Sequence, residues 1–338
     1  MPPLVSIVVL CYNHAAYLDD CLKGLLSQTY RDLEVIITDD HSSDSSWEIV
    51  QRYQPILDRA FPRVVCQRNE RNLGFFGALK RAQTHITGNF LCFLDGDDFY
   101  YPSKIARNVA FLAEYPGVGF VHSDVDFLFA ESGRLERDWW KGIHTPPQGR
   151  VFESLVLGNH IMTCSMCCRT GLFQDHVDFR RYEAASYRMA DHPMFLDLSL
   201  NTEFGYIDEA LACYRVLPES ASRFANPAKQ LDFQLSCIQI CLDYVERHEV
   251  PEQTRNAILR RRAKFLFEYG YLLGREDICR EGYAWLCEHS PDIYGTLPNR
   301  LRVLASRYRP LRSFSHWWRA IRSLGRPGGG HEGARRPW

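Results

Sequence analysis

Three strand-length and largely apolar runs, each followed by polar or acidic residues, constrain the fold of this chain most strongly. They are VSIVVL at residues 5–10, LEVIIT at 33–38 and LCFL at 91–94. Unbroken runs of this kind are typical of strands buried on both faces. The segments between them have helical periodicity, and a further short strand is expected at 64–67. Alternating strands and helices with short connections predict an α/β fold, with a mostly parallel sheet and helices on both of its faces.

The acidic stretch DGDD follows the third run and contains Asp95, Asp97 and Asp98. In open α/β sheets, ligands bind at the carboxyl ends of the strands. Carboxylates gathered there repel one another and lose hydration unless a positive charge joins them. A divalent cation bridging to phosphate oxygens is one interpretation, because hard cations take oxygen ligands. A solvated acidic turn is the alternative.

Four segments together resemble the inverting family 2 glycosyltransferases, whose nucleotide-sugar-binding domain has a GT-A type fold. In the order and at the spacing of that family, they are VSIVVLCYNHAAYLDDCLKGLLSQTY, EVIITDDHSSDSS, NERNLGFFGALKRA and FLCFLDGDDFYYPSKI. The resemblance covers roughly residues 4–220, and four motifs in register are specific where each alone is weak. It implies transfer of a sugar from a nucleotide-diphosphate-sugar, usually UDP-linked, to an acceptor hydroxyl. Inversion and a divalent metal, Mn²⁺ or Mg²⁺, are implied as well.

The resemblance also implies roles for residues that would bind the nucleotide-sugar. Asp40 matches the aspartate that accepts a hydrogen bond from the nucleotide base, and Asp39 either does this instead or holds the loop. The structural alternative for the pair is an Asx turn with a helix cap. Tyr12 packs near the base or in the core. Asn72 and Gly74 match a stretch whose backbone approaches the nucleotide, or they form an ordinary helix entry.

Within the D-x-D motif, the resemblance implies that Asp97 coordinates the metal and that Asp95 contacts the ribose or the metal. Asp98 is expected to cap a helix or to support the metal ligands. His41 stands where the family usually has glycine. Because glycine adopts positive φ most easily, a different backbone is expected in that loop.

A general base for the acceptor hydroxyl is expected downstream of the D-x-D motif. The family usually carries it in a Glu-Asp pair at a helix start, and Asp191 in YRMADHPMFLDLSL matches the aspartate. Ala190 replaces the glutamate, and the alternative role for Asp191 is a helix N-cap. Arg215 and Arg223 are candidate phosphate contacts, with surface ion pairs as the alternative.

The pair Asp124 and Asp126 follows another strand-like run, at a spacing that puts both side chains on one face of an extended chain. We interpret it either as lining the sugar or acceptor pocket or as part of a simple surface strand.

Composition and charge exclude several other classes. A net charge of −1 gives no sign of nucleic-acid binding. The twelve cysteines have no framework-like spacing, and we expect buried free thiols in a reducing compartment. Neither a signal peptide nor an apolar run long enough to span a bilayer is recognisable. A cytoplasmic protein, peripheral at the inner face of the membrane, is expected.

The pattern along the whole sequence predicts a catalytic domain at 1–225, a helical accessory region at 226–292 and a basic amphipathic tail at 293–338. The tail contains ten arginines and one acidic residue, interleaved with leucines and with Trp317 and Trp318. Such a segment is typical of binding to an anionic membrane surface, which would bring the protein near a saccharide or lipid-linked acceptor. The alternative is a helix that packs on an acidic face of its own protein. Its last stretch is expected to be disordered.

Two other functions compete with glycosyl transfer. A sugar nucleotidyltransferase also uses acidic residues and a metal on an α/β sheet, but CYNHAAYL lacks its glycine-rich phosphate loop and basic residues. The same absence disfavours an NAD enzyme. A non-catalytic binding or scaffold relative that kept the fold is the second rival, and Ala190 and His41 are the features that favour it.

Overall fold

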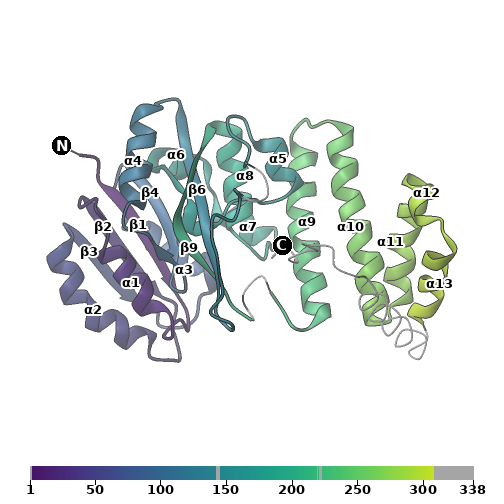
Figure 1. Ribbon diagram of the computed structural model, residues 1–338, viewed down its shortest axis with the longest axis horizontal. Helices are drawn as coiled ribbons and strands as arrows, with labels where there is room; N and C mark the ends of the chain where they lie inside the picture. Colours follow the sequence, from purple (N-terminus) through teal and green to yellow (C-terminus); the bar gives the residue numbers. More distant parts are fainter. Residues whose placement is uncertain (1, 142–144, 219, 221–222, 308–338) are drawn as a thin grey trace. The chain divides into compact units, whose positions relative to one another are not determined.

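The computed structural model describes residues 2–141, 145–218, 220 and 223–307, and the chain divides into the compact units Met1–Leu217 and Pro218–Trp338 (Figure 1). The division lies a few residues before the boundary expected at 225/226. The last part of the predicted tail, from 308 to 338, lies outside the described residues, and so does its expected disorder.

A nine-stranded sheet forms the centre of the first unit, in the order β3-β2-β1-β4-β8-β6-β9-β5, with β7 paired to β6. The strands are β1 Val5–Cys11, β2 Leu33–Asp39, β3 Arg63–Arg68, β4 Phe90–Asp95, β5 Phe99–Tyr100, β6 Val118–Phe129, β7 Leu135–Glu136, β8 Cys167–Arg169 and β9 Glu203–Val216. β1 to β4 pair in parallel, whereas β8 is antiparallel to both β4 and β6. The predicted α/β fold is confirmed, with antiparallel pairs beyond β4 that the alternating pattern does not reveal.

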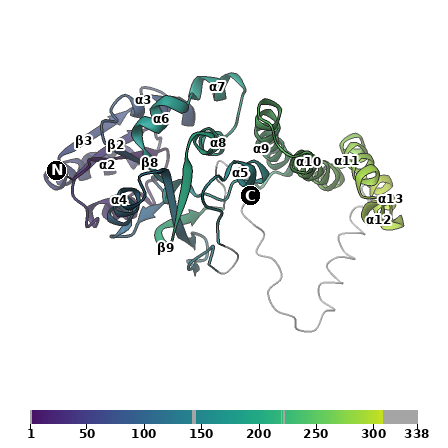
Figure 2. The same ribbon diagram turned by 90° about the horizontal axis from the view of Figure 1, so that it is seen from above.

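Helices cover both faces of this sheet, with α2 and α4 on one side and α3 and α6 on the other (Figure 2). The helices of this unit are α1 Leu18–Leu26, α2 Ser46–Ala60, α3 Gly74–Gln83, α4 Lys104–Glu114, α5 Phe152–Leu157, α6 Thr170–His176, α7 Phe179–Ala184 and α8 Asp191–Asn201, together with a 3-10 turn at Thr163–Ser165.

Alternate strand residues divide between the two faces, which explains the unbroken apolar runs. Ile7 and Val9 of β1 are fully buried in one core cluster with Leu22 of α1. On the opposite face, the ring of Phe93 from β4 packs 5.6 Å, centroid to centroid, from that of Phe173 on α6. Each fully buried side chain of this size stabilises the fold by about 1.5–3 kcal/mol.

The second unit is helical in the part that the structure describes. Its helices are α9 Pro227–Arg247, α10 Glu252–Leu273, α11 Glu276–His289, α12 Pro291–Tyr294 and α13 Leu297–Ser306. α10 and α11 approach closely at Gly282, where an added Cβ would lie 2.4 Å from the Ala263 carbonyl oxygen. The helical C-terminal region expected from the sequence is therefore confirmed.

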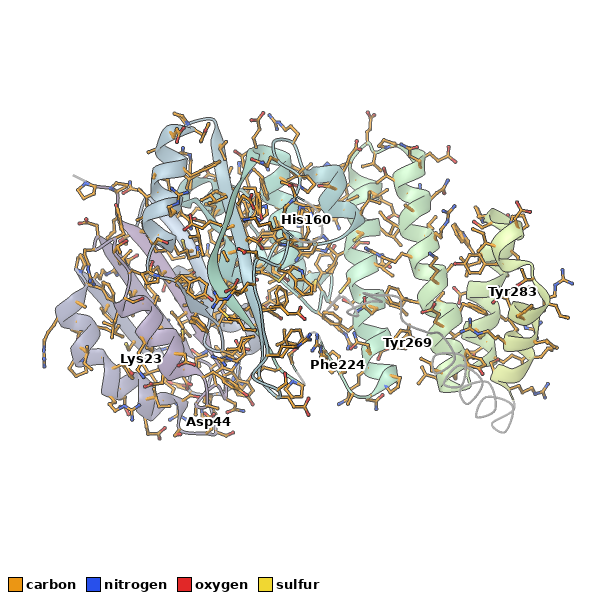
Figure 3. The ribbon with its side chains drawn as sticks, viewed as in Figure 1. Lys23, Asp44, His160, Phe224, Tyr269 and Tyr283 are labelled. Carbon is orange, nitrogen blue, oxygen red and sulfur yellow. The ribbon has the colours of Figure 1, made fainter. Side chains whose placement is uncertain are left out.

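His122 on β6 is a buried imidazole with unusual surroundings. It is 1% exposed, and neither ring nitrogen has a hydrogen-bond partner among the described residues. Its ring centroid lies 6.2 Å from that of His160 (labelled in Figure 3) and 5.2 Å from that of Tyr206. Burial, reinforced by the nearby His160, lowers the pKa of His122 to about 3.

We expect the free energy of unfolding to decrease as the pH falls below the ordinary histidine pKa of about 6.5. Unfolded His122 binds a proton below that pH, whereas folded His122 does so only near its lowered pKa, so acid favours the unfolded state. This group alone would remove about 2 kcal/mol of stability at about pH 5. Denaturant unfolding at about pH 5 and pH 7 measures the loss, which should shrink in His122→Phe. An unchanged pH dependence in that variant, with exposed His176→Gln as control, would contradict this origin.

Candidate active site

The carboxyl ends of β1, β2 and β4 bring the two acidic segments to one edge of the sheet. Asp39, the last residue of β2, pairs in register with Cys11 of β1. Asp95, the last residue of β4, pairs with Leu10 of the same strand. Both segments therefore flank the end of β1, at the edge where ligands bind in open α/β sheets.

The carboxylate of Asp95 is crowded by two others. Burial is the largest cause that raises the pKa of Asp95 to about 8, and the negative charges of Asp97 and Asp191 add to it. Asp191 is far along the chain, so its effect on Asp95 places the start of α8 close to the D-x-D motif. Three carboxylates that sequence reasoning selected separately thus share one electrostatic environment.

Asp98 does not cap a helix. It is 2% exposed, and its Oδ1 accepts a hydrogen bond of 2.7 Å from the backbone N–H of Arg215. α4 begins at Lys104, after Ser103. Burial raises the pKa of Asp98 well above its usual range, and the charges of Asp97 and Asp95 raise it further. Asp98 thereby ties the D-x-D loop to β9.

Arg215 on β9 holds the same loop through its side chain. Its Nε donates to the Asp97 carbonyl oxygen at 2.8 Å, and its Nη2 donates to Asp20 Oδ2 at 2.9 Å. The guanidinium carbon also lies 4.8 Å from the ring centroid of Tyr17, and the residue is only 8% exposed. In this structure Arg215 therefore positions the D-x-D backbone, and its predicted phosphate contact stays a prediction. Arg223 belongs to the second unit, where its backbone bridges that of Ser220.

Gly96 and His14 form a close approach beside the D-x-D carboxylates. A Cβ at Gly96 would lie 2.8 Å from Nδ1 of His14, so only glycine fits this position without a shift. Nε2 of His14 lies 4.0 Å from Oδ1 of Asp97. The backbone N–H of His14 donates to Ser46 Oγ at 2.9 Å, which fixes the loop after β1.

Asp191 is the first residue of α8 and is half-buried. Burial raises the pKa of its carboxyl, while hydrogen bonds from the backbone N–H groups of His192 and Asp191 and from the Asn159 amide counteract this effect. Nδ2 of Asn159 donates to Asp191 Oδ2 at 3.2 Å. Ala190, which replaces the usual glutamate, is 3% exposed and brings no polar side chain to this point.

Asp39 and Asp40 hold the loops that follow β2 and β3. Asp40 is 5% exposed, and its Oδ1 accepts from Asn69 Nδ2 at 2.7 Å and from the Leu73 N–H at 2.8 Å. Asp39 is fully buried, and its Oδ1 accepts from the Ser42 N–H at 3.1 Å. This bond spans three residues, one more than an Asx turn, so it closes the loop without forming the turn expected as the structural alternative. The base contact predicted for the pair stays a prediction.

The carboxylate of Asp44 lies just before α2 and bonds the first residue of that helix. Oδ1 of Asp44, labelled in Figure 3, accepts from the Ser46 N–H at 3.0 Å, at the start of α2. Its Oδ2 accepts from the Ala15 N–H at 3.0 Å. Asp44 therefore ties the loop after β1 to the loop after β2.

Tyr12 follows β1 directly and is 46% exposed, so the alternative of core packing is excluded. The adjoining loops have left-handed backbone at Asn13 (φ 56°) and His41 (φ 63°). His41 therefore adopts the conformation that glycine favours, despite its side chain. Asn13 Oδ1 accepts from the Ser43 N–H at 2.8 Å, which braces the two loops.

Asn72 and Gly74 form the entry to α3. Oδ1 of Asn72 accepts from the Gly74 N–H at 2.9 Å, and Gly74 has a φ of 70°. Apart from its chain neighbours and the backbone of its own helix, no described residue has an atom within 4 Å of a Cβ built at Gly74. Its positive φ, rather than a close approach within the protein, therefore explains the glycine. The predicted nucleotide contact of this pair is not tested by these bonds.

Asp124 and Asp126 are buried, and the surface-strand interpretation was wrong. They lie on β6 and are 1% and 2% exposed. Asp124 accepts from the backbone N–H groups of Trp140 and Lys141, at 3.0 and 3.2 Å. Asp126 accepts from the Asp138 N–H at 3.0 Å and from the hydroxyl of Tyr101 at 2.6 Å. Both carboxylates therefore fix the chain around residues 138–141, a contact that spacing along one strand cannot reveal.

Comparison with known proteins decides the family. The sequence model for glycosyl transferase family 2 matches residues 6–177, which include both acidic strand ends. The chain belongs to glycosyl transferase family 2. The resemblance inferred from the four motifs is thereby confirmed.

Relatives and solved structures agree with this family 2 assignment. The chain is 33% identical over 168 residues to the Escherichia coli UDP-Glc:alpha-D-GlcNAc-diphosphoundecaprenol beta-1,3-glucosyltransferase WfaP. The aligned region covers 49% of this chain and 59% of WfaP. The chain is 22% identical over 243 residues to WfgD of Escherichia coli, a transferase of the same description, covering 72% and 87% of the two chains. The S. aureus TarS 1-349 crystal structure is similar in fold, with a TM-score of 0.57 at 17% identity, covering 94% and 92%.

The acidic residues of this family 2 chain fit a divalent cation that is shared with a ligand. Among the described residues, no group of three or more histidine, cysteine, aspartate or glutamate side chains is arranged to hold a metal alone. Asp95 and Asp97 are crowded carboxylates whose mutual repulsion a cation would relieve. Mg²⁺ and similar ions are commonly held by one or two carboxylates, with phosphate oxygens and water completing the shell.

The sequence missed three residues of this site: His14, Asp20 and Asn159. His14 and Asp20 carry a signal, since both lie in the first of the four family segments, whereas Asn159 stands in none of them. All twelve cysteines are free, as expected, and most are buried. In the part of the chain that the structure describes, no helix is both long and apolar enough to cross a membrane.

Proposed function

We propose that this family 2 protein is a metal-dependent, inverting glycosyltransferase. In this proposal it transfers a sugar from a UDP-linked donor to a hydroxyl of a lipid-linked saccharide, in cell-surface glycan synthesis. The observation that carries the proposal is that the family 2 model matches residues 6–177, which include the strand ends that bear Asp39 and Asp95. WfaP is described as using UDP-Glc and a diphosphoundecaprenol-linked acceptor, which supports this choice of donor and acceptor class.

Each acidic residue has a chemical task in this proposal. Asp97, with Asp95, would hold the divalent cation, which neutralises charge on the departing nucleoside diphosphate. Asp40 would accept a hydrogen bond from the uracil ring N–H, through the oxygen that does not bond Asn69 and Leu73. Asp191 would accept the proton of the attacking hydroxyl, and a raised pKa makes its carboxylate a better acceptor.

A transfer assay tests the proposal directly. The purified full-length protein is incubated with UDP-glucose, a short-chain lipid diphosphate carrying N-acetylglucosamine, and either Mn²⁺ or a chelator. Glycosylated lipid should form with metal and not with chelator, and its linkage should be β when the donor is α-linked. If no donor in a panel of UDP-sugars is transferred or hydrolysed, while UDP still binds, the chain would instead be a binding relative.

We further propose that the second unit brings the protein to an anionic membrane surface. α13 has two different faces. Val303 is buried in a core with Phe267, and Arg302 lies 4.7 Å from the ring centroid of Phe267, so one face packs within the unit. On the other face Leu297, Leu301 and Leu304 are each more than half exposed, beside exposed Arg300 and Arg307.

The two faces of α13 each agree with one of the two interpretations of the tail, intramolecular packing and membrane binding. Intramolecular packing accounts for Val303 and Arg302, whereas the leucine row has no apolar cover among the described residues. A row of exposed leucines flanked by arginines matches the amphipathic pattern of segments that lie in a lipid interface. The arginine-rich sequence that follows α13 adds charge of the same sign.

We expect full-length protein to sediment with vesicles that contain anionic lipid, and truncation after Arg307 to weaken this binding strongly. The truncation removes seven of the ten arginines of the 293–338 segment and all three of its tryptophans. Each basic side chain near such a surface is worth about 1 kcal/mol, and salt weakens the attraction. UDP binding should be unchanged. Equal sedimentation of both proteins, or sedimentation with neutral vesicles alone, would contradict the proposal.

A further inference from the structure

Asn159 stands in the loop after α5 and contacts the carboxylate at the start of α8. Its Nδ2 donates to Asp191 Oδ2 over 3.2 Å. The two residues are far apart in sequence, so this contact depends on how the first unit folds. It joins a neutral, non-titrating side chain to the candidate proton acceptor.

The orientation of the Asn159 amide is fixed from its other end. Its Oδ1 accepts a hydrogen bond of 3.0 Å from the backbone N–H of Ile161, a residue that is 1% exposed. A backbone N–H can only donate, so the oxygen of the amide must face Ile161 and the nitrogen must face Asp191. The amide therefore presents a donor to the carboxylate.

A second bond ties the same two segments together. Nε2 of His192, the neighbour of Asp191, donates to the carbonyl oxygen of Leu155 on α5 at 2.8 Å. Leu155 is fully buried, and His192 is 2% exposed. The start of α8 is thus held at two points. His192 bonds the backbone of α5, and the Asp191 carboxylate accepts a bond from Asn159 in the loop after α5.

We propose that Asn159 is a positioning residue that fixes Oδ2 of Asp191 and leaves Oδ1 to accept the proton of the attacking hydroxyl. This inference rests on the proposed function of Asp191. The Asn159 bond adds to the hydrogen bonds that this carboxyl receives from the backbone N–H groups of His192 and Asp191, and together they restrict its rotation. A misplaced acceptor loses rate even when substrate binds normally. The role differs from metal binding and from donor binding, because Asn159 touches neither Asp95 nor Asp97 among the described contacts.

The test is a double-mutant cycle measured by single-turnover transfer from UDP-glucose. Asn159→Ala should lower the rate by about ten- to a hundredfold, the effect of a hydrogen bond to a charged group, while the KM for UDP-glucose changes by less than about threefold. In the Asp191→Asn background, the same substitution should change the residual rate by less than about twofold, because the carboxylate it positions is gone. Asn159→Asp, which keeps the shape but removes the donor, should be at least as slow as Asn159→Ala.

Asn201→Ala is the matched control, since the Asn201 amide caps the other end of α8 by bonding the Asp197 carbonyl oxygen at 2.8 Å. It should transfer at the wild-type rate. A wild-type rate for folded Asn159→Asp, or equal losses from Asn159→Ala with and without Asp191, would overturn the positioning role. If Asp191→Asn itself transfers normally, the proposed function fails first, and that result is distinguishable from a failure of Asn159 alone.

Discussion

Asp97→Asn should abolish the metal-dependent part of UDP binding while leaving the fold intact. The Asp97 carboxylate is 16% exposed, and Nε2 of His14 lies 4.0 Å from its Oδ1. An amide of the same shape therefore costs little stability, yet it is a much poorer ligand for a hard cation. We expect UDP affinity in the presence of Mn²⁺ to fall at least about a hundredfold. Calorimetric titration of UDP with Mn²⁺ and with a chelator measures the loss.

The same titration contains its own control. Without metal, wild type and Asp97→Asn should bind UDP equally weakly, because the nucleoside contacts proposed for Asp40 are untouched. Asp58→Asn on α2 makes the same chemical change at an exposed position, and it should keep the metal-dependent affinity. Unchanged Mn²⁺-dependent binding in folded Asp97→Asn would remove this residue from the site and leave Asp95 as the candidate ligand.

Much of this site could be predicted from local patterns in the sequence, because the residues at a strand end differ visibly from those of the strand itself. The runs that became β1, β2 and β4 are largely apolar, and the acidic pairs and clusters begin where these runs end, although Asp39, Asp40 and Asp98 are themselves buried. Parallel pairing then brings Asp39 and Asp95 to either side of β1 without further information. Asp191 could be found only through a family motif, since an aspartate at a helix start is ordinarily a cap.

Residues that depend on long-range contacts could not be predicted in this way. Arg215 reaches the Asp97 carbonyl from β9, and Asp124 reaches the Trp140 N–H across a loop, so neither partner is encoded by spacing. The antiparallel position of β8 between β4 and β6 is equally invisible, because its three residues carry no strand periodicity. The role proposed for Asn159 is the hardest to predict from sequence, because it depends entirely on the two hydrogen bonds that its amide makes.

Asp191→Asn should retain donor affinity and lose most of the transfer rate. An amide cannot take up the proton of the acceptor hydroxyl, but it keeps the shape of the side chain and can still accept hydrogen bonds at the start of α8. A positioned general base contributes about 10²–10⁴-fold, and we expect a loss within that range. Single-turnover transfer at saturating UDP-glucose isolates the chemical step, so slow product release cannot mask the effect.

Two comparisons make this result specific to proton transfer. UDP titration with Mn²⁺ should give the same affinity for Asp191→Asn as for wild type, or a slightly higher one, because a negative charge that acts on Asp95 is removed. Asp175→Asn on α6 is the exposed counterpart and should transfer normally. A rate for Asp191→Asn within a few-fold of wild type would move the base elsewhere. Asp126 would be examined next, although its bond to the Tyr101 hydroxyl already gives that carboxylate a structural task.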